Sequence, residues 1–223
     1  QAPLHVVIIP DGNRRWAKDN QRSPVEGHYK GYERIGELVT EAKKTNVKVL
    51  TIWAFSTENW TRSKEEVGSL FTIINKGLNE IYKKAKEEKV RFVHLGRKDR
   101  LDVVTLDLIT KIEEETKEYT DFCLCLAIDY GGEDEIKRAE EKWRLQNDPT
   151  LGIYHFLDTS LNGIPRPDFI IRTSGECRTS GFMPLQSQYS EWHFESCHFP
   201  DFDTTLFHKA LEIYNMRERR FGK

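Results

Sequence analysis

The chain has 223 residues, of which 34 are Lys or Arg and 36 are Asp or Glu, and its formal net charge is -2. A chain of this length can bury a core of its own, and mixed charges of both signs argue against a nucleic-acid-binding stripe. The four cysteines lack zinc-site spacing, and no apolar run or signal peptide indicates a membrane span or export. We therefore expect one cytoplasmic domain over residues 1–223, with reduced thiols.

Apolar runs alternate with longer amphipathic stretches along the whole chain. The first run, at residues 5–10, is continuously hydrophobic, which is typical of a strand buried on both faces. Further strands are expected at 47–55, 90–95, 121–128 and 168–172, and helices at 26–45, 64–88, 102–118, 131–147 and 203–217. This alternation predicts an α/β fold with a mostly parallel central sheet and flanking helices.

A polar turn follows the first strand, with Asp11, Gly12, Asn13, Arg14 and Arg15 ahead of residues that can begin a helix. Ligands of open α/β sheets bind at the carboxyl ends of the strands. Arginines and backbone amides at a helix start suit a phosphate or diphosphate. A carboxylate in the same turn would repel that anion unless a divalent cation lies between them. The turn therefore predicts a metal–diphosphate site.

A second polar cluster follows the second strand and contains Ser56, Asn59 and Arg62. Ser63, with Glu66 three residues later, has the spacing of a capping box for the next helix. Capping does not by itself require Ser56, Asn59 or Arg62. We therefore expect these three side chains to take part in binding or chemistry.

The helix expected at 64–88 has an apolar stripe with a period of about 3.6 residues. The stripe consists of Val67, Leu70, Phe71, Ile74, Leu78 and Ile81. An ordinary core-facing helix is the interpretation that this pattern favours. The wall of an apolar tunnel would have the same periodicity, so the sequence leaves both open.

A third polar cluster follows the last predicted strand, where Arg172 and Arg178 flank Ser174, Gly175 and other small residues. A loop of this kind wraps an anion with backbone and guanidinium groups. Taken alone it is also compatible with an ordinary charged surface loop. Three strands of one predicted sheet end in such turns, however, and this convergence indicates one shared anion site.

The segment from Asp11 to Lys18 resembles the signature of the cis-prenyltransferases, the undecaprenyl diphosphate synthase family. The segments 56–62, 172–180, 186–191 and 220–222 are similar to further motifs of that family, in the same order. The resemblance implies an apolar substrate tunnel, a homodimer and loose contact with a membrane for product release. The implied reaction is Mg²⁺-dependent cis-condensation of isopentenyl diphosphate onto an allylic prenyl diphosphate, which gives a linear Z-polyprenyl diphosphate.

The same resemblance implies roles for individual residues. Asp11, Asn13, Ser56 and Asn59 would lie nearest the chemistry, with the proton acceptor left open and pyrophosphate among the candidates. Asp11 and Glu191 would hold Mg²⁺, with Glu191 supplied by the same chain or by a neighbouring subunit. The implied substrate-binding residues are Gly12, Arg14, Arg15, Trp16, His28, Trp60, Arg62, Arg172, Arg178, Ser180, Arg220 and Gly222.

Two alternatives stay open. Pro184 and Leu185 stand where the family more often has bulkier apolar residues, which favours irregular, head-to-middle coupling of two allylic diphosphates. A non-catalytic partner subunit of a heteromeric prenyltransferase is the other alternative, although such subunits tend to lose the aspartate and the arginine loop. The chain has no Asp-Asp-x-x-Asp, G-x-x-x-x-G-K-[ST] or G-x-G-x-x-G motif, which argues against trans-prenyltransferases and nucleotide-binding proteins.

Overall fold

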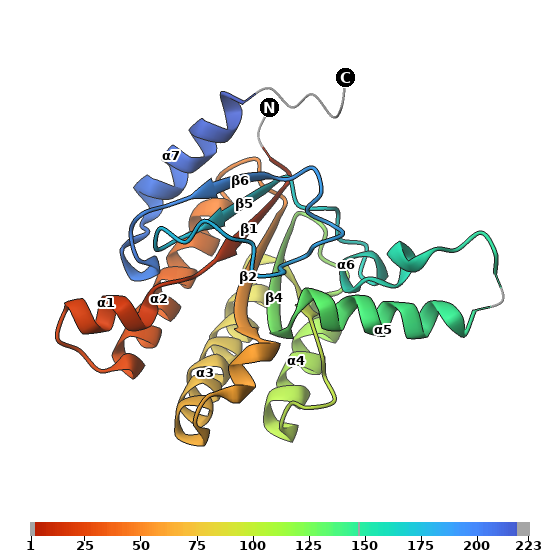
Figure 1. Ribbon diagram of the computed structural model, residues 1–223, viewed down its shortest axis with the longest axis horizontal. Coiled ribbons are helices and arrows are strands. Elements are labelled where there is room, and N and C mark those ends of the chain that lie inside the picture. Colours follow the sequence, from red (N-terminus) through yellow and green to blue (C-terminus); the bar gives the residue numbers. More distant parts are fainter. Residues whose placement is uncertain (1–2, 147, 218–223) are drawn as a thin grey trace.

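A computed structural model describes residues 3–146 and 148–217. Its centre is a six-stranded sheet in the order β3-β4-β2-β1-β5-β6, in which neighbouring strands run parallel (Figure 1). The strands are β1 (His5–Ile9), β2 (Val49–Ser56), β3 (Val90–Leu95), β4 (Phe122–Tyr130), β5 (Phe169–Arg172) and β6 (Glu191–Phe194).

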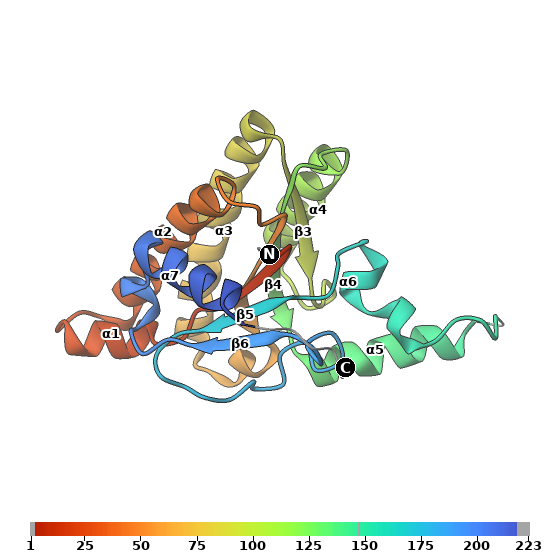
Figure 2. The same cartoon turned by 90° about the horizontal axis from the view of Figure 1, so that it is seen from above.

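Helices connect these strands, as expected for parallel β–α–β units. They are α1 (Asn13–Asp19), α2 (Pro24–Ala42), α3 (Lys64–Glu88), α4 (Val103–Thr116), α5 (Gly132–Arg144), α6 (Asp158–Leu161) and α7 (Thr204–Asn215). Short 3₁₀ turns are η1 (Thr57–Thr61), η2 (Ile153–Phe156) and η3 (Phe199–Asp201). Figure 2 shows α2, α3 and α7 on one side of the sheet and α5 and α6 on the other. None of these helices is long and apolar enough to cross a membrane.

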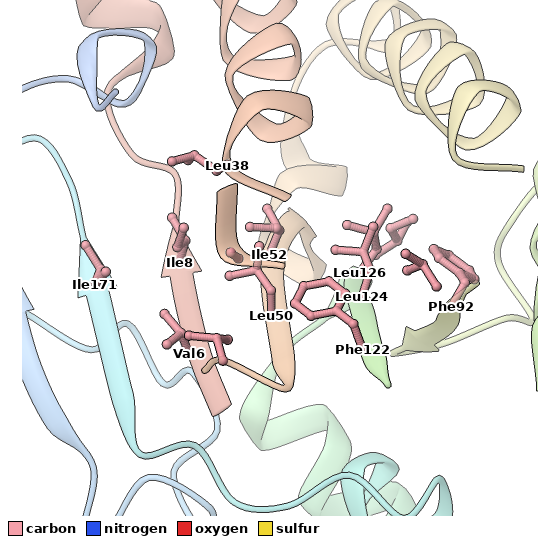
Figure 3. Close-up of a cluster of buried hydrophobic side chains, with 14 of the residues drawn as sticks. Val6, Ile8, Leu38, Leu50, Ile52, Phe92, Phe122, Leu124, Leu126 and Ile171 are labelled. Carbon is pink, nitrogen blue, oxygen red and sulfur yellow. The ribbon is translucent and has the colours of Figure 1, made fainter. Parts of the chain in front are cut away.

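Side chains alternate between two cores, one on each face of the sheet. Val6 and Ile8 of β1 are fully buried on the face that α2, α3, α4 and α7 cover. Figure 3 shows them in line with the labelled side chains of β2 and β4, with Leu38 reaching down from α2. Val7 and Ile9 point to the opposite face and contact a second cluster that includes Phe182. Burial on both faces explains why β1 is a continuous apolar run.

The five predicted strands and five predicted helices are confirmed, with ends that shift by a few residues. Helix α3 spans the predicted range and buries Leu70, Phe71 and Leu78 in the core, so this part of its stripe faces the core. Ser63 accepts a hydrogen bond from the Glu66 N–H at 3.2 Å, which confirms the predicted N-cap. The Glu66 carboxylate does not complete a capping box, because it points toward Arg14 and Arg62 instead.

Candidate active site

The first and third polar loops meet at the carboxyl edge of the sheet. Ile9 of β1 is in register with Arg172 of β5, so the residues after each strand become neighbours. Arg172 donates a hydrogen bond from Nη2 to Asp11 Oδ2 at 2.9 Å. The Thr173 hydroxyl donates to the Asp11 carbonyl oxygen at 2.7 Å. The predicted convergence of these two loops is therefore confirmed.

A network of charges continues from this contact into the third loop. Arg15 donates to Asp11 Oδ1 at 3.1 Å and to Glu176 Oε1 at 2.6 Å. Glu176 also forms an ion pair with Arg178. Arg172 is only 4% exposed and donates through Nη1 to Ser180 Oγ at 2.8 Å. Its buried Nε has no hydrogen-bond partner within the described residues, so it still has a hydrogen to donate to a ligand.

Gly12 lies between β1 and α1, at the N-cap of α1. Its φ of 100° is in the left-handed region, where a side chain is strained. A Cβ atom at this position would lie 2.4 Å from Ser174 Oγ and 2.7 Å from His198 Nδ1. Those two groups are hydrogen-bonded at 2.6 Å, and His198 Nε2 lies 3.1 Å from Asp19 Oδ2 at the end of α1. The missing side chain thus lets the first loop pack closely against the third.

We expect Gly12→Ala to lower the free energy of unfolding by about 1–3 kcal/mol, because it combines an unfavourable φ with contact against two fixed side chains. Gly68→Ala is the matched control, since Gly68 lies in α3 and a Cβ there would meet nothing within 4 Å. The control should raise stability by about 0.5–1 kcal/mol, as alanine does in a helix. Denaturant unfolding of both variants measures the difference, and equal effects would contradict this account of Gly12.

The second polar loop faces the first across a cleft. Glu66, in the first turn of α3, lies 3.0 Å from Arg62 Nη1 and 3.7 Å from Arg14 Nη1. This carboxylate therefore holds arginines from two different loops near each other. Asn59 Oδ1 accepts a hydrogen bond from the Ser56 N–H at 3.1 Å. Asn59 does not cap α3, but its amide stabilises the turn that follows β2.

Between the two loops lies a cavity of about 560 Å³. Its walls carry four cationic side chains, from Arg14, Arg15, Lys18 and Arg62. Asp11 supplies the one carboxylate among its lining residues. The remaining lining residues are Pro10, Gly12, Asn13, Pro24 and His28. A cavity with this excess of positive charge is suited to an anion such as a diphosphate.

His28 is a neutral polar group of this cavity. Burial, together with the positive charges of Arg62 and Arg14, lowers the pKa of its imidazole from 6.5 to about 4. Its buried Nε2 has no hydrogen-bond partner within the described residues, and the same holds for Oδ1 of Asn13. Asn13 packs closely against α2 because Gly27 and Gly31 have no side chains. A Cβ at Gly31 would lie 2.5 Å from Asn13 Oδ1. The cavity therefore offers two unused polar atoms to a ligand.

The lowered pKa of His28 predicts acid destabilisation. The unfolded chain takes up a proton on this residue below pH 6.5, whereas the folded chain resists until about pH 4, so stability falls as pH falls through that window. The wild type should lose about 3 kcal/mol more than His28→Gln between these limits. His5, whose pKa burial also lowers to about 4, acts in the same direction but is present in both proteins. Urea unfolding at several pH values tests this, and parallel curves would contradict it.

An apolar cavity of about 90 Å³ adjoins the charged cavity. We call it the near cavity. Pro10, Asn13 and His28 line both spaces, so the two cavities are neighbours at these residues. The other walls of the near cavity come from α2, α3 and the sheet, and include Tyr32, Ile35, Ala54, Leu70, Ile73, Ile74, Gly77, Ile81 and Leu126. The stripe of α3 thus faces both the core and a cavity.

Several predicted site residues lie elsewhere. Trp16 donates from Nε1 to Asp201 Oδ1 at 2.8 Å, which fastens α1 to η3, and it does not line the charged cavity. Trp60 stacks on Phe71 with ring centroids 5.3 Å apart, at the edge of the core. Ser56 ends β2 and Asn59 lies in η1, and neither lines the cavity. Aromatic and polar residue types in a motif do not reveal which way their side chains point.

Glu191 lies at the other end of the sheet from Asp11. It begins β6 and is in register with Phe169, the first residue of β5, about 10 Å along the strand from Arg172. Its carboxylate accepts a hydrogen bond from Arg217 at 3.0 Å. The expectation that the same chain brings Glu191 to Asp11 is therefore wrong, whereas supply by a neighbouring subunit stays a prediction. Arg220 and Gly222 lie outside the described residues.

Lys18, Glu66 and Glu176 are functional candidates that sequence reasoning missed. Lys18 is one turn beyond Arg14 on α1, and that helical spacing brings it to the same cavity wall. The spacing of Ser63 and Glu66 predicts only a capping role for Glu66. Glu176 stands between Arg172 and Arg178 in the sequence, and opposite charges so close together were a signal for an ion pair.

Comparison with known proteins agrees with this geometry. A family model described as putative undecaprenyl diphosphate synthase matches residues 9–222. The isoprenyl transferase of Aquifex aeolicus (strain VF5) is 41% identical over 229 residues, which cover 99% of this chain and 96% of the relative. The isoprenyl transferase of Streptococcus thermophilus (strain CNRZ 1066) is 40% identical over 231 residues, which cover 99% of this chain and 93% of the relative.

Solved structures give the same result. Lavandulyl diphosphate synthase from Lavandula x intermedia, in complex with dimethylallyl diphosphate, has a TM-score of 0.95 and 32% identity, covering 100% of this chain and 99% of that one. A probable undecaprenyl diphosphate synthase from Campylobacter jejuni has a TM-score of 0.83 and 29% identity, covering 100% of both chains.

The parallel sheet with a cation-lined edge and these matches define the class of protein as a transferase of prenyl groups. The chain belongs to the undecaprenyl diphosphate synthase family, which confirms the resemblance noted in the sequence.

Proposed function

We propose that this protein condenses isopentenyl diphosphate with an allylic prenyl diphosphate in the cis configuration and releases a linear Z-polyprenyl diphosphate. The observation that carries the proposal is the junction of two unlike spaces. The charged cavity of about 560 Å³ meets the apolar near cavity of about 90 Å³ at Pro10, Asn13 and His28. A diphosphate with a hydrocarbon tail matches both spaces at once.

The allylic diphosphate occupies the charged cavity in this proposal. Arg14, Arg15 and Arg62 bind its oxygens, and neutral His28 contributes a hydrogen bond. Gly12 and Asn13 lie at the start of α1, where free backbone N–H groups favour an anion. The tail then points past Asn13 into the near cavity, the first part of a proposed tunnel between α2 and α3.

Isopentenyl diphosphate binds along the third loop. Arg172, Arg178 and Ser180 lie together there, and the unused Nε of Arg172 adds a donor. Because Arg172 also contacts Asp11, the second diphosphate lies next to the first. This arrangement brings the two reacting carbon chains to one edge of the sheet, which lowers the entropic cost of their encounter.

Mg²⁺ is the proposed cofactor, and Asp11 is the residue of this chain that would hold it. Among residues 3–146 and 148–217 no group of three or more His, Cys, Asp or Glu side chains could hold a metal. A single carboxylate fits Mg²⁺, which commonly binds one or two protein carboxylates together with substrate phosphates and waters. When bound, the ion stabilises the negative charge that develops on the departing pyrophosphate.

The reaction breaks the bond between the allylic carbon and its diphosphate oxygen. The double bond of isopentenyl diphosphate supplies the electron pair for the new carbon–carbon bond, and a proton then leaves to form the new cis double bond. We propose that the released pyrophosphate accepts that proton. The Asn13 amide, which belongs to a residue that lines both cavities, orients the reacting groups. Asn59 acts indirectly by holding the backbone at Ser56.

We propose that the protein is a cytoplasmic homodimer, and that it contacts a membrane only when its hydrophobic product leaves. A second copy would bring Glu191 to the Mg²⁺ held by Asp11, because Glu191 lies at the wrong end of the sheet in its own chain. Arg220 and Gly222 would reach the same site from the second copy. The intact ion pairs of Asp11 with Arg15 and Arg172 argue against a non-catalytic subunit.

Coupling of two allylic diphosphates is the second candidate. One observation favours it, the TM-score of 0.95 with a lavandulyl diphosphate synthase that was solved with dimethylallyl diphosphate. In this chain Pro184 packs against Gly132, with 2.4 Å between Pro184 Cδ and a Cβ placed on the glycine. Pro184 is one of the two residues at which the sequence differs from the commoner family pattern.

A product assay separates the candidates. The protein is incubated with Mg²⁺, labelled isopentenyl diphosphate and, in turn, dimethylallyl, geranyl and farnesyl diphosphates, and the products are sized by chromatography. Labelled prenyl diphosphates with Z double bonds are the expected result. Unlabelled product from dimethylallyl diphosphate alone would support allylic coupling instead, and no product from any starter would contradict both.

A further inference from the structure

The space for a hydrocarbon chain in this protein is short and divided. Beyond the near cavity lies a second apolar cavity of about 70 Å³, which we call the far cavity. The two cavities share Tyr32, Ile35, Gly77 and Ile81 as lining residues, so they are consecutive along the groove between α2 and α3. Tyr32 has the largest side chain of the four and stands at the boundary.

Tyr32 crosses this groove from α2 and rests on α3. A Cβ placed on Gly77 would lie 2.9 Å from its Cε2 and 3.3 Å from its Cδ2, so the ring fits only because residue 77 has no side chain. The Tyr29 ring packs edge-on against it, with centroids 6.0 Å apart. Burial and a hydrogen bond to Glu80 raise the pKa of the Tyr32 hydroxyl, which fastens the tip of the side chain to α3 as well.

An ion pair lies at the far end of the groove. Lys43, which follows α2, forms an ion pair with Glu88 at the end of α3, and its Nζ lies 3.4 Å from the Glu88 carbonyl oxygen. Glu88 lines the far cavity. This bridge joins the two helix ends where a longer chain would have to leave the groove.

The volumes indicate how much chain fits. A cavity of about 150 Å³ holds benzene, which corresponds to about 25 Å³ per carbon atom. The near cavity, at about 90 Å³, therefore holds most of one five-carbon unit, and the far cavity holds less. An undecaprenyl chain would need on the order of 1,400 Å³ at the same packing. The groove is far too small for such a product.

We propose that Tyr32 is the specificity-determining residue that ends the hydrocarbon tunnel, so that this protein makes a short prenyl diphosphate of about ten to fifteen carbon atoms. The inference rests on the proposed function and narrows its product class. One unit fills the near cavity, and the units that carry the reacting carbons occupy its mouth beside Asn13 and His28. The ring of Tyr32 blocks further growth.

The first test is the size of the product in Tyr32→Ala, measured with labelled isopentenyl diphosphate. The variant joins the two cavities, so we expect its products to be longer than those of the wild type by at least one five-carbon unit. Tyr32→Phe keeps the ring and should keep the wild-type product. Tyr29→Ala is the matched control and should leave the product length unchanged, because Tyr29 lines neither the near nor the far cavity.

The second test does not depend on catalysis. Unreactive n-alkyl diphosphates of increasing length are titrated into the protein, and each methylene that enters the tunnel should tighten binding about fourfold. In the wild type this gain should stop at the length that reaches Tyr32, whereas in Tyr32→Ala it should continue over several more carbons. Tyr32→Phe and Tyr29→Ala should behave like the wild type.

The outcomes separate this inference from the proposed function. Long products from the wild type would overturn the role of Tyr32. The same would follow if wild type and Tyr32→Ala had the same product length and the same alkyl chain length beyond which binding stops tightening. Absence of condensation in every variant would overturn the proposed function, and the alkyl series would then still decide where the tunnel ends. If binding to Tyr32→Ala continues to tighten with longer alkyl chains than binding to the wild type does, the inference is supported in either case.

Discussion

Asp11→Asn should lower kcat/KM for prenyl transfer by about a thousandfold, the loss expected when one group that stabilises developing charge is removed. The substitution keeps the shape of the side chain and removes its charge. Asp11 is the single carboxylate that lines the charged cavity, between Arg15 at 3.1 Å and Arg172 at 2.9 Å. Its carboxylate has lone pairs left over from these two bonds, which a cation could use.

The measurement is initial rate against Mg²⁺ concentration for wild type and variant. The wild type should lose activity in chelator and regain it with added Mg²⁺, whereas the variant should stay slow at every concentration. Asp107→Asn removes the same charge from an exposed position on α4 and should change neither the rate nor its dependence on the ion. Activity of Asp11→Asn within threefold of the wild type would exclude Asp11 as the metal-holding residue.

Most of the sheet could be predicted from sequence because its strands are buried on both faces. Such strands are continuous apolar runs, and β1 and β4 are buried at every residue. The exception is β6, which has four residues and lies at the edge of the sheet, where one side of the strand lacks a neighbour. Its pairing with β5 depends on backbone hydrogen bonds and leaves no apolar run to find.

The site could be predicted at the level of loops and not of side chains. Parallel strands bring their carboxyl ends to one edge, so Asp11 and Arg172 had to be close. The direction of each side chain depends on local turns and on neighbours far away in the sequence. For that reason Trp60 packs on Phe71 at the edge of the core, and Glu66 points toward Arg14 and Arg62. The division of the groove by Tyr32 depends on Gly77, a contact between two helices that neither sequence segment reveals.

Arg172→Lys should raise the KM for isopentenyl diphosphate by about a hundredfold while it preserves the positive charge, because lysine cannot reproduce the planar fork of donors. The guanidinium makes three contacts in three directions. Nη2 donates to Asp11 at 2.9 Å, and Nη1 donates to Ser180 Oγ at 2.8 Å and to the Arg178 carbonyl oxygen at 2.5 Å. A lysine ammonium at the same depth reaches only part of this set and leaves some of these acceptors without a donor.

The effect on the two substrates should differ, because Arg172 belongs to the third loop and does not line the cavity proposed for the allylic diphosphate. We therefore expect the KM for the allylic substrate to change several times less than that for isopentenyl diphosphate in steady-state assays with each substrate varied in turn. Arg144→Lys, at an exposed ion pair with Glu140 on α5, is the matched control and should change neither value. Equal increases for both substrates would contradict the assignment of separate diphosphate sites, since a merely structural role for Arg172 would disturb both loops that it joins.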